Sequence, residues 1–197
     1  MTQELVEVGT GLELVQLEVG KILYEELNTE IDQFQSLWQQ RDAEWQSLVG
    51  LGDADVVVEY IEDQNFHLGH RPSLILNDTP REAYPNISVM AYQGRPTDNI
   101  IDQASNFNIA IDIEVMTKSE SSELEVDRRT HRTVEAVQQV LSRNSSLGGK
   151  SLGWDNAPII QLTDIFARQE NVSTGEQWFW QGSRIRYTLD KNTMLDW

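Results

Sequence analysis

The stretch that decides the fold is Asn106-Phe107-Asn108-Ile109-Ala110-Ile111-Asp112-Ile113-Glu114-Val115-Met116-Thr117. Its apolar residues occupy alternate positions, and successive side chains of a β-strand point to opposite faces. One face of such a strand carries Phe107, Ile109, Ile111, Ile113 and Val115, and the other carries Asn108, Asp112 and Glu114. On a helix the same apolar residues would scatter around the whole circumference, so the pattern predicts a strand.

A helix is expected directly after this strand. Residues 118–123 supply the hydroxyls and carboxylates that cap a helix and complement the positive end of its dipole. From there the apolar period changes to about 3.6, which is typical of an amphipathic helix. Its apolar side holds Leu124, Val134, Val137, Val140 and Leu141. Residues 144–149, rich in Asn, Ser and Gly, end the helix.

Length and composition favour one folded domain. The chain has 197 residues, 39% of them hydrophobic and 24% charged, which is typical of a globular protein with a single core. We expect a single α+β domain over 1–197, with a flexible arm at 1–11, a helical extension at 12–50 and a sheet-and-helix core at 51–197.

The charge balance argues against non-specific binding of nucleic acid or anionic membrane. The formal net charge is -17, and both of those partners are negative. The start of the chain lacks the basic and apolar pattern of a secretory signal, so we expect synthesis in the cytoplasm. Because the chain has no cysteine, neither disulfides nor thiolate metal sites can stabilise it.

The N-terminal part predicts a pair of helices. Residues 12–27 have an apolar stripe at helical spacing, and a capping-box pattern at 28–32 predicts that a second helix begins there. Helical spacing then continues to Gly50, so a short turn would make an antiparallel hairpin. A strand near 14–19 is the alternative for the first half.

The remaining segments favour strands. Runs at 56–62, 73–77 and 87–92 are rich in β-branched residues, 159–168 looks extended, and 178–189 alternates. Residues 170–176 are expected to join the last two as a hairpin loop. The predicted fold class is therefore α+β, with a mainly antiparallel sheet, one long packed helix and an N-terminal helix pair.

Three groups of residues are candidate metal ligands. His67 and His70 follow acidic residues, but they lie three apart around a glycine, which does not match helical zinc sites. Asp112 and Glu114 share a strand face, as divalent-metal ligands of a nuclease or hydrolase would; Asp53 and Asp55, near Glu59, are a second acidic group. The competing interpretation is that these are ordinary loop and solvated surface residues.

No stronger catalytic motif is found. No Gly-x-Ser-x-Gly elbow occurs, nothing ties a serine to His131, and 148–151 lacks the full phosphate-binding spacing. We therefore expect no enzymatic activity, no catalytic or metal-binding residues and no cofactor.

Aromatic and arginine residues instead point to association. The second face of the last strand, opposite Phe179 and Ile185, carries Trp178, Trp180, Arg184 and Arg186, and the predicted helix carries Arg128, Arg129 and Arg132. Such residues are enriched at interface cores. We expect the arginines to pair with acidic surface on a neighbouring copy, giving a head-to-tail contact. The alternative for the tryptophans is that the N-terminal helix pair covers them.

The segment from Asn106 to Leu189 resembles the tail terminator and tail-completion proteins of long-tailed bacteriophages. The similarity lies in the alternating strand 107–115, the helix containing 127–137, the extended segment and the closing strand 184–189. It covers less than half of the chain and includes no catalytic motif.

The resemblance implies a structural subunit of the virion. Such proteins form a hexameric ring that caps the tail tube and joins it to the neck, with DNA passing through without specific binding. Implied partners are further copies, tube and neck or connector proteins, and possibly sheath, after assembly in the host cytoplasm. The helical extension 12–50 leaves open another neck, baseplate or sheath adaptor role.

Overall fold

The computed structural model describes residues 11–49, 56–69, 83–96, 107–147, 154, 157–171 and 176–190. These ranges contain two α-helices, α1 (Gly11–Val49) and α2 (Glu123–Arg143), and a short 3-10 turn, η1 (Asp63–Asn65). Their six strands are β1 (Phe66–Leu68), β2 (Asn86–Pro96), β3 (Phe107–Ser119), β4 (Ile159–Leu162), β5 (Phe166–Asn171) and β6 (Glu176–Asp190).

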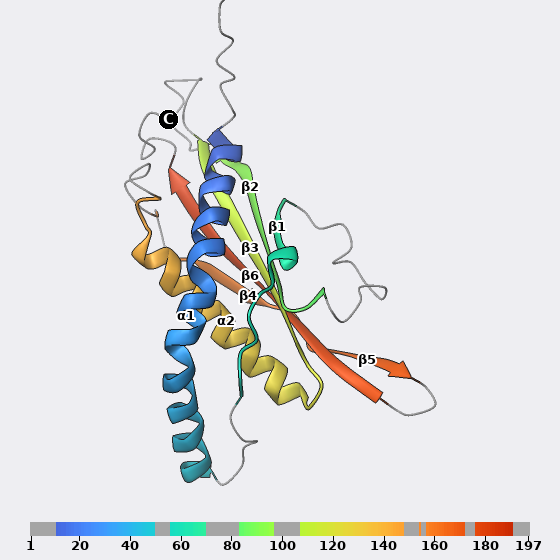
Figure 1. Ribbon diagram of the computed structural model, residues 1–197. Coiled ribbons are helices and arrows are strands. Elements are labelled where there is room, and N and C mark those ends of the chain that lie inside the picture. The colour runs from blue at the N-terminus through green and yellow to red at the C-terminus, as the bar shows by residue number, and fades with distance from the viewer. Residues whose placement is uncertain are drawn as a thin grey trace, which may run out of the picture.

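The strands form one mainly antiparallel sheet with both helices on one side (Figure 1). The strand order is β1-β2-β3-β6-β4, and β5 pairs with the N-terminal part of β6. Only the short β1–β2 pair is parallel among the described strands. The predicted α+β class with a mainly antiparallel sheet is thus confirmed, and the stretch that predicted it, β3, lies at the centre.

The core lies between the helices and the inner face of the sheet. The alternating residues Ile109, Ile111, Ile113 and Val115 of β3 are almost completely buried. They meet a stripe on α1 and a stripe on α2, the latter made of Val134, Val137, Val140 and Leu141. The helix α2 begins where expected, with the Ser122 hydroxyl accepting a hydrogen bond from the Glu125 N–H.

The N-terminal helix pair is not what the structure shows, because α1 is one continuous helix of 39 residues. The alternative of a strand near 14–19 is wrong for the same reason. Asn28, expected to cap a second helix, instead donates to the Ile61 carbonyl and accepts from the Ile61 N–H. Leu27 and Ile31 are both fully buried, so the apolar stripe passes this point without a break.

The segment 56–62, predicted as a strand, does not join the sheet. It runs along α1, and helix side chains provide hydrogen bonds that a strand neighbour would otherwise make. Gln35 donates to the Val58 carbonyl at 2.8 Å, and Asp42 accepts from the Val56 N–H at 3.2 Å.

These two residues and Asn28 follow one another at intervals of seven, which is close to two helical turns, so all three lie on one side of α1. From Asn28 to Gln35 the helix rises by about 10 Å, as does the extended chain from Val58 to Ile61. The β-branched residues of segment 56–62 therefore do favour an extended backbone, but that backbone forms its hydrogen bonds with side chains of α1 and not with another strand.

The C-terminal strands follow the prediction more closely. The extended segment 159–168 forms β4 and the start of β5, and both strands pair with β6. Between β4 and β5, the Thr163 N–H donates to the Gly182 carbonyl. The β5–β6 pairing confirms the hairpin. The predicted arm at 1–11 and the run at 73–77 lie outside the described residues, apart from Gly11 at the start of α1.

Neither described helix combines the length and apolar character that crossing a bilayer requires.

We predict that Asn28→Ala lowers the free energy of unfolding by about 1–3 kcal/mol, because it leaves the Ile61 N–H and carbonyl without their partner. Urea unfolding of the purified protein measures this change. The matched control is Gln33→Ala, an exposed position in the same helix, which should change stability by no more than about 0.5 kcal/mol. Equal effects of the two substitutions would show that Asn28 does not anchor the segment.

Candidate functional site

The outer face of the sheet, opposite the helices, carries an ordered row of charges. Asp112 of β3 lies directly across from Arg186 of β6, and Glu114 lies across from Arg184. Opposite charges at facing positions of an antiparallel pair attract each other. Arg186 makes two hydrogen bonds to the Asp112 carboxylate, at 2.7 and 2.8 Å, and Arg184 Nε donates to Glu114 at 3.0 Å.

Asp112 is the buried centre of this row, with 2% of its surface exposed. The Tyr92 hydroxyl on β2 donates to the same carboxylate, and the Arg186 guanidinium lies 5.4 Å from the Tyr92 ring centre. Burial alone would raise the pKa of Asp112, but the bonds from Arg186 and Tyr92 and the nearby positive charges outweigh it and lower that pKa. No sequence pattern singled out Tyr92, because its role depends on the register between β2 and β3.

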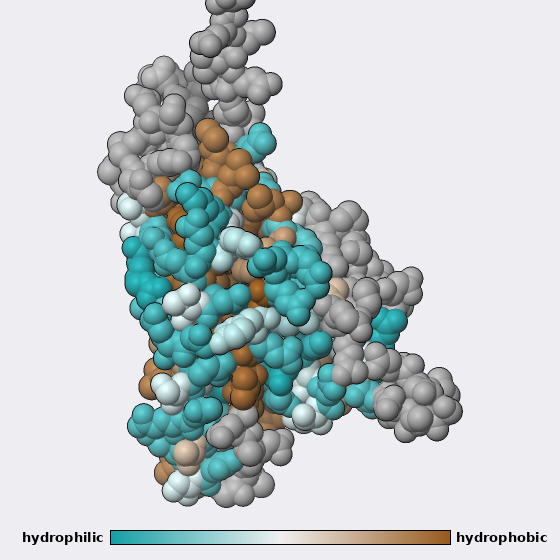
Figure 2. Space-filling model, in the orientation of Figure 1, coloured by the Kyte–Doolittle hydropathy of each residue, from teal (hydrophilic) through white to brown (hydrophobic). Residues whose placement is uncertain are grey.

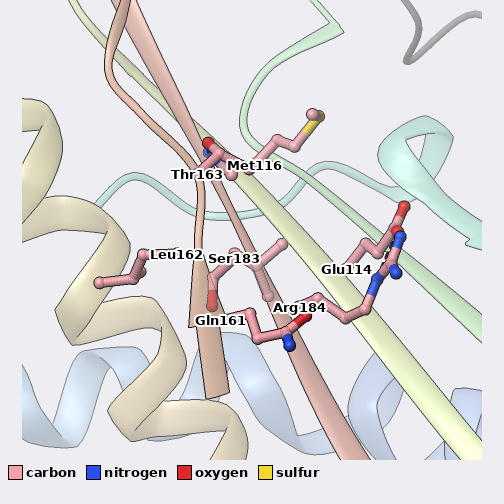
Figure 3. A pocket seen from close by; sticks show the side chains of 9 residues that line it. Glu114, Met116, Gln161, Leu162, Thr163, Ser183 and Arg184 are labelled. Atoms are coloured by element: carbon pink, nitrogen blue, oxygen red, sulfur yellow. Dashed lines mark hydrogen bonds and ion pairs between the residues drawn. The ribbon is translucent and has the colours of Figure 1, made fainter.

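A small pocket of about 420 Å³ adjoins the row, where β4 meets β6 (Figure 3). Figure 3 shows the Glu114–Arg184 pair on one side and Leu162 pointing the other way, toward α2. Thr163, Met116 and Gly182 form its far end; the Gly182 N–H donates to the Thr163 hydroxyl at 3.0 Å. Its charged groups already bond to each other, so the pocket presents a neutralised surface.

The α2 arginines form a second charged group between the helices and segment 56–62. Arg132 and Arg128 both pair with Asp42 of α1, and the Arg132 side chain is only 9% exposed. Arg132 also donates to the Val56 carbonyl and lies 5.7 Å from the Trp38 ring centre.

Arg129 bonds to Glu59 and Glu125, at 2.5 and 2.6 Å. The three arginines expected at a contact between copies therefore have carboxylate partners within the subunit. Their role in assembly stays a prediction, but their charge no longer requires a neighbour. Helical spacing alone could not identify Asp42 or Glu59 as their partners.

The tryptophans of β6 are not covered by an N-terminal helix pair, because α1 lies on the opposite side of the sheet. Trp178 is 2% exposed and packs with Ala83 and Tyr84, the ring centres of Tyr84 and Trp178 being 5.4 Å apart. Trp180 is half-buried and stacks on Phe166 of β5 at 4.4 Å. Trp180 and Phe166 thus give the projecting β5–β6 end an accessible aromatic surface.

The candidate metal ligands are not brought together. Within the described residues, no group of three or more His, Asp or Glu side chains is arranged to hold a metal ion. Asp112 and Glu114 bond to arginines, so a cation there would have to displace two guanidinium groups. His70, Asp53 and Asp55 lie outside the described residues, as does 148–151.

Comparison with known proteins gives no match, either to a model of a protein family or to the sequence of a curated protein.

We predict that Arg132→Met lowers the free energy of unfolding by about 3–5 kcal/mol, because the buried Asp42 carboxylate then keeps only its longer contact to Arg128, at 3.3 Å, and the Val56 carbonyl loses its donor. The control is Arg41→Met: this arginine pairs with Glu135 but its side chain is 51% exposed, so about 1 kcal/mol or less should be lost. Urea unfolding measures both. Adding Asp42→Asn to Arg132→Met removes the negative charge of Asp42. If this double variant is no more stable than Arg132→Met alone, the weakly paired Asp42 charge is not the cause of the lost stability.

We also predict a pH dependence from Asp112. Because its pKa in the folded protein is below the ordinary value of 3.8, its ionised form stabilises the fold above about that pH. This contribution is lost as the pH falls through the folded pKa. The stability advantage of wild type over Asp112→Asn should therefore shrink below about pH 3.8.

Urea unfolding from pH 7 to pH 3 measures this difference. The matched control Asp164→Asn replaces an exposed carboxylate and should change stability at neutral pH by no more than about 0.5 kcal/mol. A gap between wild type and Asp112→Asn that stays constant with pH would contradict the assigned role of Arg186.

Proposed function

We propose that this protein is a structural subunit of a bacteriophage tail, similar to the tail terminators, which forms a ring at the head-proximal end of the tube and joins the tail to the neck. The observation that carries the proposal is the β3–α2–β6 unit. The segments on which the resemblance rests form one contiguous block, with β3 and β6 adjacent and α2 packed across both. Strand β3, helix α2 and strand β6 follow one another along the chain in the order in which the resemblance was described.

The charged groups support a structural role over a catalytic one. On the outer face each acidic side chain named as a candidate ligand bonds to an arginine of β6. Arginine–carboxylate pairs of this kind fix strand register and occupy the oxygens that would bind a cation. We therefore favour assembly over a metal-dependent hydrolase or nuclease.

The net charge fits a conduit for DNA. A ring built from subunits of formal charge -17 repels phosphates, so DNA can pass without adhering. The ring would be a homohexamer in the virion, with tube and neck or connector proteins as its neighbours. An adaptor in the neck, baseplate or sheath is the second candidate, because the long α1 extends the compact unit.

We predict that the purified protein forms closed rings at high concentration, or joins tails when expressed with the tube protein. Mass photometry and negative-stain electron microscopy measure the ring, and gold labelling of a tagged chain locates it on particles. Label at the head-proximal end supports the terminator; label at the opposite end would instead favour a baseplate adaptor. A protein that stays monomeric and joins no particle, or that cleaves DNA until a chelator is added, contradicts the proposal.

A further inference from the structure

The described helix layer is narrower than the sheet. The helix α1 packs on β1 and β2, and α2 packs on β3 and β6. Neighbouring strands lie about 4.8 Å apart and packed helices about 8–10 Å apart, so one helix covers about two strands. The strand β4, beyond β6 in the strand order, lies at the edge of this cover: Leu162 points toward α2, yet all four β4 residues are exposed.

The inner side of β4 is apolar and accessible. Ile160 lies across from Ile185, whose side chain is in the core, so Ile160 and Leu162 project from the helix side of the sheet. Each of the two is 41% exposed, and all four residues of β4 are exposed. We call Ile160 and Leu162 the β4 shelf. An accessible apolar strand at a sheet edge is a surface on which another chain readily packs.

The opposite margin of the subunit carries a matching apolar surface. Leu17 and Tyr24, two turns apart on α1, are 45% and 50% exposed, and Leu68 of β1 beside them is 53% exposed. These three residues, which we call the α1 flank, line a groove of about 380 Å³. Figure 2 shows hydrophobic side chains gathered toward the N-terminal end of α1, on a face that is otherwise mostly hydrophilic.

Gly20 leaves room for the Leu68 side chain in this groove. A Cβ at Gly20 would lie 2.3 Å from a methyl carbon of Leu68, so a larger residue there would make the Leu68 side chain turn away from α1. The α1 flank is therefore a continuous surface built from a helix and a strand.

Each surface carries a charge that the other can pair with. Lys21, exposed between Leu17 and Tyr24, gives the α1 flank a positive group, whereas Asp63, which also lines this groove, bonds to the Tyr24 hydroxyl. Beside the β4 shelf, Gln181 donates both to Asp127 of α2 and to the Thr163 carbonyl, which places the Asp127 carboxylate at the end of β4. Asp164, next along the chain, is exposed.

We propose that the α1 flank of one copy of this chain docks on the β4 shelf of the next copy. The neighbour's α1 then supplies the third helix that the sheet lacks, lying beside α2 over β4. Each subunit offers both surfaces at opposite margins, so the contact is head-to-tail and repeats until a ring closes. The inference rests on the proposed ring and names the surfaces that build it.

Two single substitutions test the contact. Leu162→Lys damages only the β4 shelf, and Leu17→Glu damages only the α1 flank; both side chains are more than 40% exposed, so the fold should persist. Each variant alone should lose assembly and run as a monomer in analytical ultracentrifugation. Mixed in equal amounts, they should form a heterodimer or larger species, because each retains the surface that the other needs. Circular dichroism and the Tm check folding.

The matched control is Leu48→Glu, an 81% exposed position near the C-terminal end of α1, which should assemble as the wild type does. Cross-linking gives a second measurement, and the chain has no cysteine to interfere. The double variant Leu17→Cys with Leu162→Cys, treated with a short bis-maleimide, should give a ladder of multimers. Either single cysteine variant should give no ladder.

The outcomes separate this inference from the proposed function. If wild type forms rings and the Leu17 and Leu162 variants form them equally well, the docking surfaces are wrong and the ring-forming role stands. If both variants are monomeric but their mixture gives no heterodimer and the double cysteine variant no ladder, the head-to-tail pairing is wrong. A wild-type protein that remains monomeric and joins no tail overturns both proposals.

Discussion

The rest of the structure depends on the two unlike faces of β3. Its inner face is apolar and excludes water against both helices, while its outer face places Asp112 and Glu114 in a row. A buried carboxylate is costly unless it is paired and hydrogen-bonded, so β6 must present arginines at the facing positions. The register of β3 and β6 therefore satisfies a hydrophobic and an electrostatic requirement together, and a slip by one residue would break both.

Asp42 plays a comparable part on the helix side. Its carboxylate accepts the Val56 N–H and pairs with Arg128 and Arg132, which joins α1, α2 and segment 56–62 at one point. Because Asp42 is nearly buried, this junction is fixed in position. It also explains how a protein of high negative charge uses its few cations: the described arginines of α2 and β6 neutralise carboxylates within the fold.

The proposed assembly follows from what the fold leaves unsatisfied. Ion pairs within the subunit neutralise the charged clusters, whereas apolar side chains remain accessible at the β4 shelf and the α1 flank. Burial of apolar surface is the main favourable term in association, and charge at the rim fixes orientation. If subunits contact each other through the β4 shelf and the α1 flank, the rest of the acidic surface stays free to line a channel.

The sequence by itself determined the α+β class, β3, β6, the helix α2 and the hairpin of β5 and β6, because alternation, helical period and capping are local properties. It failed where a distant residue decided the outcome. Asn28 has the chemistry of a helix cap, but bonding to Ile61 made it an interior residue of α1. The β-branched run at 56–62 found helix side chains as partners, and the arginines of α2 found Asp42 and Glu59. Only the tertiary structure decided these pairings, because a hydrogen bond or ion pair depends on which groups meet in space, and composition does not specify that.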